Sequence, residues 1–183
     1  FMIMLMAGSA FAAEDILIEN FEKGSDDTGW IIEGDEDFGG IANRMGRTGV
    51  TGCQRDMFVY TALSAGNDAK GRLTSPPFNL DRDYINFLIG GGGFAGETCM
   101  NLIVDDKVVR AATGPNTEEG GSKELDWQSW DVRKLKGRKA RIQIVDDRKG
   151  LWGYIAVDHI YQSDHKMEAI KNATREFKLE KKY

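Results

Sequence analysis

Residues Tyr84–Asp106 read YINFLIGGGGFAGETCMNLIVDD. An apolar run over Tyr84–Ile89 leads into a glycine-rich segment, Gly90–Gly96, and a second apolar run covers Thr98–Val104. β-branched and aromatic residues favour strands, and glycine accepts the positive φ angles that special loops need. We therefore predict two adjoining core strands joined by a glycine loop, and this loop is the first place to look for function.

The glycine segment also satisfies a nucleotide-binding pattern, because Gly91–Gly96 matches G-x-G-x-x-G after a strand. That motif requires a helix to begin at the loop, so that its N-terminal amides and dipole hold a pyrophosphate. Here Cys99–Val104 continues as a strand and Asp105-Asp106 forms a turn. The sequence therefore favours glycines that shape a tight, close-packed connection at a sheet end over a dinucleotide site.

Composition narrows the class of protein. The chain has 183 residues, enough for one domain with a core and a tail. Its net charge of −5 argues against a nucleic-acid partner, which clustered Lys and Arg would have to bind. Hydrophobic residues make up 41% of the chain and glycines number 22, which is typical of a turn-rich β domain.

The N-terminus resembles a secretory signal. Phe1–Phe11 is an apolar run too short to span a membrane, and Ala10-Phe11-Ala12 offers an A-x-A cleavage site before Glu14 and Asp15. No basic segment precedes the run, so we expect residues 1–12 to be a signal peptide truncated at its start. The protein would then be secreted, periplasmic or on the cell surface. The alternative for this run is a buried N-terminal strand.

Few residues are available for metal or disulfide chemistry. Cys53 and Cys99 either form a disulfide or remain buried thiols, and the sequence leaves both possibilities open. Together with the two histidines they lack the close spacing of a metal site. We expect no cofactor; a structural calcium ion among turn carboxylates such as Asp146 and Asp147 is the one metal considered, and solvated carboxylates are the alternative.

Short strands separated by turn signals run through the chain. Pro76 and Pro77 cannot donate to a ladder, so the segment that contains them is predicted as an edge strand. The pattern predicts an all-β fold, a two-sheet antiparallel β-sandwich of jelly-roll type over residues 13–163, with residues 164–183 as a linker and the start of a following module. The expected strands are Ile16–Phe21, Trp30–Ile32, Asp56–Tyr60, Gly71–Phe78, Tyr84–Ile89, Thr98–Val104, Lys107–Ala112 (a hairpin partner across Asp105-Asp106), Ala140–Val145 and Tyr154–Tyr161.

Motifs of catalysis are missing from the sequence. It contains no G-x-S-x-G elbow, no H-E-x-x-H and no P-loop, and its acidic residues form no specific pair for sugar hydrolysis. His159 lies inside an alternating strand, which is typical of a structural histidine. We predict no catalytic residue in this chain.

Binding of a carbohydrate has more support. Sugar sites combine an aromatic ring, which packs on the apolar face of a sugar, with charged side chains that hydrogen-bond hydroxyls. Trp152 lies in a turn beside Asp147 and Arg148, and is the best placed of four tryptophans; a core or rim position is the alternative for each. The predicted carbohydrate-binding residues are Trp152, Asp147, Arg148, Trp30 and Arg55.

Over about residues 15–162 the chain resembles the N-terminal accessory module of secreted glycoside hydrolase family 32 enzymes, the levanases and fructan β-fructosidases of Bacteroides-type bacteria. The resemblance implies a galactose-binding-like sandwich, a fructan ligand by association, and a hydrolase domain further along the same polypeptide. The family's catalytic motifs W-M-N-D-P-N-G, R-D-P and E-C are absent. An alternative role is a structural spacer that packs on that hydrolase. The resemblance rests on Tyr84–Gly92, Cys99–Arg110, Ala112–Gly114, Trp130–Val132, Lys136-Gly137, Ala140–Asp146, Trp152-Gly153 and Val157–Ile160.

Overall fold

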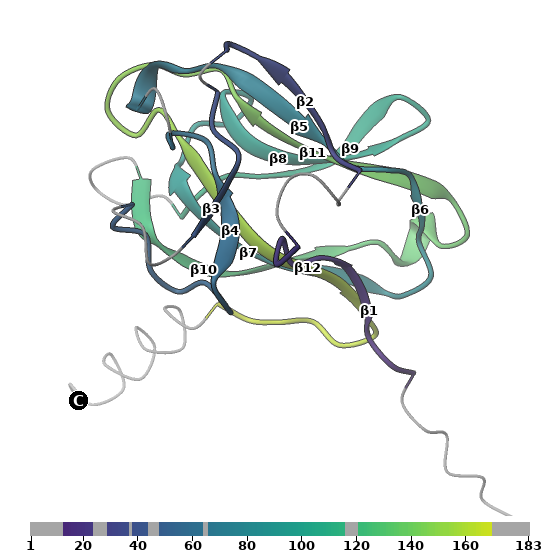
Figure 1. Ribbon diagram of the computed structural model, residues 1–183. Helices are drawn as coiled ribbons and strands as arrows, with labels where there is room; N and C mark the ends of the chain where they lie inside the picture. The colour runs from purple at the N-terminus through teal and green to yellow at the C-terminus, as the bar shows by residue number, and fades with distance from the viewer. Residues whose placement is uncertain are drawn as a thin grey trace, which may run out of the picture.

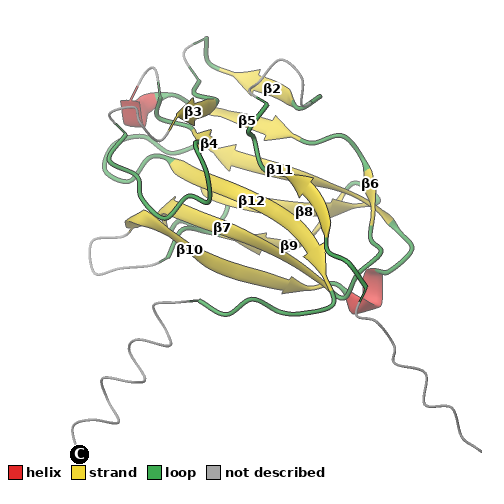
Figure 2. Cartoon of the chain, turned by 60° about the horizontal axis from the view of Figure 1, so that its bottom comes forward, coloured by secondary structure: helices red, strands yellow, loops and turns green. Residues whose placement is uncertain are grey.

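The computed structural model describes residues 13–23, 29–36, 38–43, 48–63, 66–115 and 121–169. These residues form twelve strands and two short helical turns, Gly66–Asp68 and Arg133–Leu135; the turns are drawn in red in Figure 2. The strands are β1 (Ile16–Glu19), β2 (Ile31–Gly34), β3 (Ile41–Asn43), β4 (Met57–Tyr60), β5 (Gly71–Thr74), β6 (Phe78–Asn79), β7 (Tyr84–Gly92), β8 (Thr98–Val104), β9 (Lys107–Ala112), β10 (Gly121–Asp131), β11 (Lys139–Asp146) and β12 (Ile155–Ser163). In the part of the chain that is described, no helix has the length and apolar character needed to cross a bilayer.

The strands form two antiparallel sheets. Sheet A has the order β10-β7-β12-β4-β3, with β1 also paired to β12. Sheet B has the order β2-β5-β11-β8-β9, with β6 paired to the start of β11. The two sheets lie one over the other (Figure 1). The predicted all-β, two-sheet antiparallel sandwich is confirmed.

Alternation along the strands builds the core between the sheets. Ile85, Phe87 and Ile89 of β7 and Leu102 and Ile144 of sheet B are fully buried and belong to one apolar cluster. Leu88 points to the other face of sheet A, where a second cluster forms with Phe58, Trp127 and Ala156. Because β7 is buried on both faces, its sequence is a continuous apolar run.

The glycine segment differs from the prediction. Strand β7 continues to Gly92, and β7 and β8 lie in opposite sheets, so residues 93–97 cross the sandwich instead of joining neighbouring strands. Gly91 has φ +93°, and a Cβ atom there would lie 2.5 Å from the carbonyl oxygen of Tyr154. Glycine is therefore required by a close backbone approach. A strand follows the loop, so the helix that a dinucleotide site needs is absent among these described residues.

Two other local predictions had different outcomes. The hairpin of β8 and β9 is confirmed; Asp105 and Asp106 have φ angles of 49° and 58°, as a type I′ turn requires. The edge assignment of Gly71–Phe78 is wrong, since β5 is hydrogen-bonded to β2 on one side and to β11 on the other. Strand β5 ends at Thr74 and β6 begins at Phe78, so Pro76 and Pro77 lie between the two strands. Their missing N–H groups therefore interrupt no hydrogen bond of the sheet.

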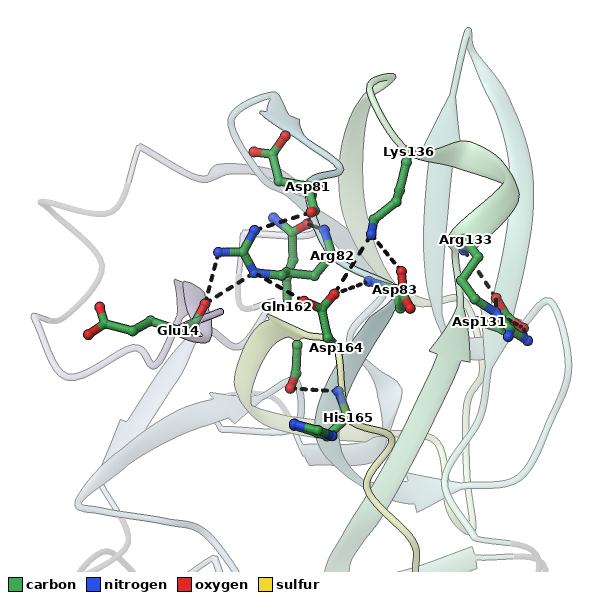
Figure 3. Close-up of polar contacts among 11 residues, drawn as sticks. Glu14, Asp81, Arg82, Asp83, Asp131, Arg133, Lys136, Gln162, Asp164 and His165 are labelled. Atoms are coloured by element: carbon green, nitrogen blue, oxygen red, sulfur yellow. Dashed lines mark hydrogen bonds and ion pairs between the residues drawn. The ribbon is translucent and has the colours of Figure 1, made fainter. Parts of the chain in front are cut away.

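The segment after β12 remains attached to the sandwich (Figure 3). The Asp164 carboxylate accepts a hydrogen bond from the Asp83 amide at 3.1 Å and lies 3.8 Å from the Lys136 Nζ. Arg82 lies between this residue and the N-terminal segment, and it donates to the Glu14 carbonyl at 3.0 and 3.1 Å.

Further along, the buried Asn86 side chain donates to the His165 carbonyl at 2.9 Å and accepts from the Met167 amide at 3.1 Å. The sulfur-bearing side chain of Met167 packs on the second apolar cluster. Residues 164–167, which we call the strap, are therefore held against the sandwich by hydrogen bonds and side-chain packing.

Candidate functional site

A loop over residues 147–154 joins β11 to β12 at one end of the sandwich and carries three of the predicted site residues. Its backbone is hydrogen-bonded to two other loops of the domain. The Asp147 amide donates to the Glu97 carbonyl at 2.7 Å, and the Gly150 amide donates to the Asn67 carbonyl at 3.0 Å. The loop is thereby held against the β7–β8 crossing and the helical turn before β5.

Asp146 anchors the loop from below. Its side chain is 1% exposed and accepts hydrogen bonds from the Thr61 hydroxyl at 2.6 Å and from the Arg148 amide at 3.3 Å. The Thr61 hydroxyl also accepts from the Ile155 amide at 2.9 Å. Burial raises the pKa of the Asp146 carboxyl above its ordinary value. Since Asp146 ends a strand of sheet B and Ile155 begins one of sheet A, Thr61 joins both sheets beneath the loop.

Two charged pairs form the rim of this site. The Arg148 guanidinium pairs with the Glu97 carboxylate at 2.8 Å and lies 3.5 Å over the ring of Phe94. Beside it, Lys70 pairs with Asp147 at 2.8 Å, and this hydrogen bond lowers the pKa of the Asp147 carboxyl. Guanidinium, ammonium and carboxylate groups in this arrangement can all hydrogen-bond the hydroxyls of a ligand.

Three buried polar atoms of this loop have no hydrogen-bond partner within the described part of the chain. They are the Arg148 Nε, the Trp152 Nε1 and the Tyr154 hydroxyl. The Trp152 and Tyr154 rings have centroids 5.8 Å apart, and burial raises the pKa of Tyr154 well above its ordinary value. Such orphaned donors are rare in folded proteins and call for an acceptor oxygen from water or a ligand.

The predicted residues fall in three places. Trp152, Asp147 and Arg148 lie together in this loop, whereas Trp30 and Arg55 lie elsewhere. For Trp152 the structure shows the alternative, a core or rim position, because the side chain is only 9% exposed. A Cβ at Gly121 would lie 2.4 Å from that ring, so the backbone of β10 covers it. The indole can offer its Nε1 hydrogen but no open face for stacking.

Trp30 lines a groove that lies between β1 and the segment before β6. Its half-buried ring packs against Phe21 with centroids 5.5 Å apart. The groove has a volume of about 160 Å³, below the roughly 300–1,000 Å³ of typical ligand sites. Its lining includes Leu17, Trp30, Pro76, Pro77 and Phe78.

Arg55 lies on the outer face of sheet A, in the exposed loop before β4. It follows Gln54, whose amide donates to the Asp158 carboxylate at 2.8 Å, so this loop lies against β12 next to His159. The structure therefore does not bring Arg55 to the loop of Trp152.

Sequence reasoning missed Lys70, Phe94, Glu97 and Tyr154, as well as Thr61 beneath them. For Phe94 and Glu97 a signal was present, since both lie in or directly after the glycine segment singled out as the first place to look. Thr61 and Lys70 carried no local signal, because they reach the site only through the pairing of strands distant in sequence.

The described residues show neither a cluster of metal ligands nor a disulfide. Among the described residues no group of three or more His, Cys, Asp or Glu side chains lies close enough to bind a metal. Asp146 and Asp147 are directed to different partners, Thr61 and Lys70. Cys53 is half-buried and Cys99 is buried, and no disulfide joins them in the structure.

Part of the chain is similar in sequence to a known protein. No family model matches the chain. A segment of 115 residues is 45% identical to ecdE of Aspergillus rugulosus, a protein named as a glycosyl hydrolase. The match covers 63% of this chain but 16% of that protein, so the chain spans a small part of the relative's length.

Solved structures with the same fold include two kinds of module. The K1 cleaved adhesin domain of Lys-gingipain from Porphyromonas gingivalis W83 aligns with a TM-score of 0.51 and 14% identity, over 81% of this chain and 97% of that one. CBM27-1 of Caldicellulosiruptor saccharolyticus, solved with mannohexaose, aligns with a TM-score of 0.50 and 8% identity, over 85% of this chain and 100% of that one. The chain has the β-sandwich fold of carbohydrate-binding modules.

Proposed function

We propose that this chain is a non-catalytic carbohydrate-binding module, and that it binds sugar at the loop of residues 147–154. One observation carries the proposal: three buried donors, on Arg148, Trp152 and Tyr154, lack an acceptor in the described structure and belong to the same loop as the charged pairs of Asp147 and Arg148. Sugars present many hydroxyl and ring oxygens, which are the acceptors that these donors lack. Displacement of the Arg148 side chain from Phe94 would also free an aromatic face for an apolar sugar face.

The comparisons support a carbohydrate-associated role at this coarser level. The fold is shared with a module solved in complex with mannohexaose, and the relative ecdE is named as a glycosyl hydrolase. We propose further that the parent polypeptide is a secreted fructan-degrading enzyme of glycoside hydrolase family 32, with this module at its front and levan or inulin as the ligand. This finer proposal rests on the sequence resemblance described above.

A titration of Arg148→Gln tests the site. A few hydrogen bonds and one ring contact usually give dissociation constants in the micromolar to millimolar range. We expect isothermal titration calorimetry of the chain with levan oligosaccharides to give saturable heat, and Arg148→Gln to weaken binding about ten-fold or more, since hydrogen bonds from charged donors contribute about 1.5–3 kcal/mol.

Arg133→Gln is the matched control. Arg133 also pairs with a neighbouring carboxylate, Asp131, and also lies over an aromatic ring, Tyr84 at 5.7 Å, but it is at the opposite end of the sandwich. Its loss should leave binding unchanged. Inulin and mannan oligosaccharides, titrated in parallel, decide the sugar. Absence of heat with every sugar up to roughly 20 mM would overturn the proposed function.

A second candidate function, a structural spacer that orients the next part of the polypeptide, is favoured by the strap. Residues 164–167 are held by Asp83 and Lys136, which Figure 3 shows, and by Asn86, so the strap has a fixed path along the sandwich. A rigid exit is what a module needs if it positions a neighbouring domain.

The strap gives a prediction for hydrogen exchange. The Met167 amide donates to Asn86 Oδ1 and, at 3.2 Å, to Ser129 Oγ. We expect this amide to be protected in the native chain and to exchange about ten-fold faster in Asn86→Ala, while amides of the β11 centre keep their protection. Exchange of Met167 at the rate of an unfolded peptide in the native chain would contradict a fixed strap.

A further inference from the structure

Strand β12 contains a β-bulge that no part of the proposed site uses. Its pairing with β7 runs regularly to Asp158↔Leu88 and resumes at Tyr161↔Asn86, so one extra residue is inserted between them. His159 lies at this point with φ +46°. For a residue other than glycine this conformation costs about 1–2 kcal/mol, and such strain is concentrated at ligand sites.

The bulge changes which side chains face outward. Before it, Ile155 and Val157 point into the core and Ala156 points to the outer cluster of sheet A. After it, Ile160 points inward and Tyr161 outward. The inserted residue, His159, therefore joins Tyr161 on the outer face, whereas a strand that continued the alternation of Ile155 and Val157 would have placed both positions inward.

Three rings gather there in mutual contact. Trp127 packs edge-on against His159 and Tyr161, with centroids 6.0 and 5.9 Å away, and the His159 and Tyr161 centroids are 5.3 Å apart. Trp127 is 6% exposed and forms the back of the group, whereas His159 and Tyr161 are half-buried. The imidazole Nδ1 is buried and has no hydrogen-bond partner in the described ranges.

Asp158 fixes the surroundings of these rings. Its carboxylate, 1% exposed, accepts from the His159 amide at 2.7 Å and from the Gln54 amide at 2.8 Å. The first contact stabilises the bulge, and the second holds the loop that carries exposed Arg55 beside the imidazole. Burial and, to a smaller extent, the Arg55 charge lower the pKa of His159, which keeps the ring neutral at pH 7.

We propose that a second ligand site lies on the outer face of sheet A and binds a neutral, hydroxyl-rich molecule such as a sugar; its residues are Arg55, Trp127, His159 and Tyr161. A neutral imidazole has one donor and one acceptor nitrogen, and a hydroxyl group can satisfy either. Aromatic edges and the Arg55 guanidinium supply apolar and hydrogen-bonding contacts around it. This site is separate from the loop of residues 147–154 and does not depend on it.

Imidazole NMR can test the site on the whole 183-residue chain. The chain has two histidines, so the ring signals of His159 and of exposed His165 can be assigned with His165→Gln. Titration with fructose, glucose and levan oligosaccharides should shift the His159 ring signals saturably and leave those of His165 in place.

Variants separate this site from the proposed one. Arg55→Gln changes only an exposed side chain, so it should leave the fold intact and weaken the His159 response about five-fold or more. Arg148→Gln should leave the His159 response unchanged while it weakens binding at the other site about ten-fold or more. No His159 shift with any of these sugars at roughly 100 mM, or an identical response in Arg55→Gln, would overturn the second site.

Discussion

Replacement of Thr61 by Val should lower the free energy of unfolding by about 3 kcal/mol and the melting temperature by about 6–12 °C. The Thr61 hydroxyl donates to the buried Asp146 carboxylate at 2.6 Å and accepts from the Ile155 amide at 2.9 Å. Valine keeps the shape of the side chain but leaves both groups without this partner in a water-excluded position. To leave a buried, charged acceptor without a hydrogen bond costs far more free energy than the net contribution of a typical hydrogen bond to stability. Thermal and urea denaturation measure the effect.

Thr61→Ser is the matched control, since it retains the hydroxyl and removes one methyl group. It should recover most of the stability lost in Thr61→Val. Because Asp146 also accepts from the Arg148 amide, Thr61→Val should weaken sugar binding as well, even though Thr61 itself lies beneath the rim. Equal melting temperatures for Thr61→Val and the native chain would contradict the role assigned to this contact.

The second large effect is a loss of stability as the pH rises through the titration of Asp158. Burial raises the pKa of this carboxyl from 3.8 to about 6, despite hydrogen bonds from two amides. The folded state therefore binds the proton more tightly than the unfolded state does. The stability that the proton contributes is fully present below about pH 4 and is lost as the pH rises to about 6 and above, and it amounts to up to about 3 kcal/mol.

Asp158→Asn isolates this contribution, because asparagine has nearly the same shape and does not titrate. Burial also raises the pKa of Asp146, which acts in the same direction in both proteins, so the comparison must be the difference between them. We expect the native chain to lose stability relative to Asp158→Asn between pH 4 and 7. Parallel stability curves for the two proteins would show that Asp158 is not destabilised by burial.

The sequence could predict the strands and the two-sheet class because these depend on local alternation. The runs over Tyr84–Ile89 and Thr98–Val104 became β7 and β8 within a few residues. It could not predict that these strands belong to opposite sheets, since the choice of sheet depends on pairing with β10, β12 and β11, all distant in the chain. For the same reason β5 was taken for an edge strand although β2 covers it.

The candidate site shows the same limit at the level of single residues. Asp147 and Arg148 lie on the rim as expected from their place in a turn rich in charge and glycine. For Trp152 the sequence left a turn position suited to stacking and a core or rim position both open, and only the structure shows that Gly121, thirty-one positions earlier in the printed sequence, covers the ring. His159 fits a structural role by alternation alone, and only the bulge seen in the structure places it beside Tyr161 on the outer face.

The most direct test of the central claim follows the Trp152 indole during sugar binding. The account holds that its Nε1 hydrogen, which has no partner in the described structure, donates to a sugar oxygen in the loop of residues 147–154. In a ¹⁵N-resolved NMR titration with levan oligosaccharides, the assigned Trp152 indole signal should move saturably with the calorimetric dissociation constant, and the Trp130 signal from the core should stay in place. A Trp152 signal that remains fixed while the sugar is bound would contradict the assignment of this loop as the binding site.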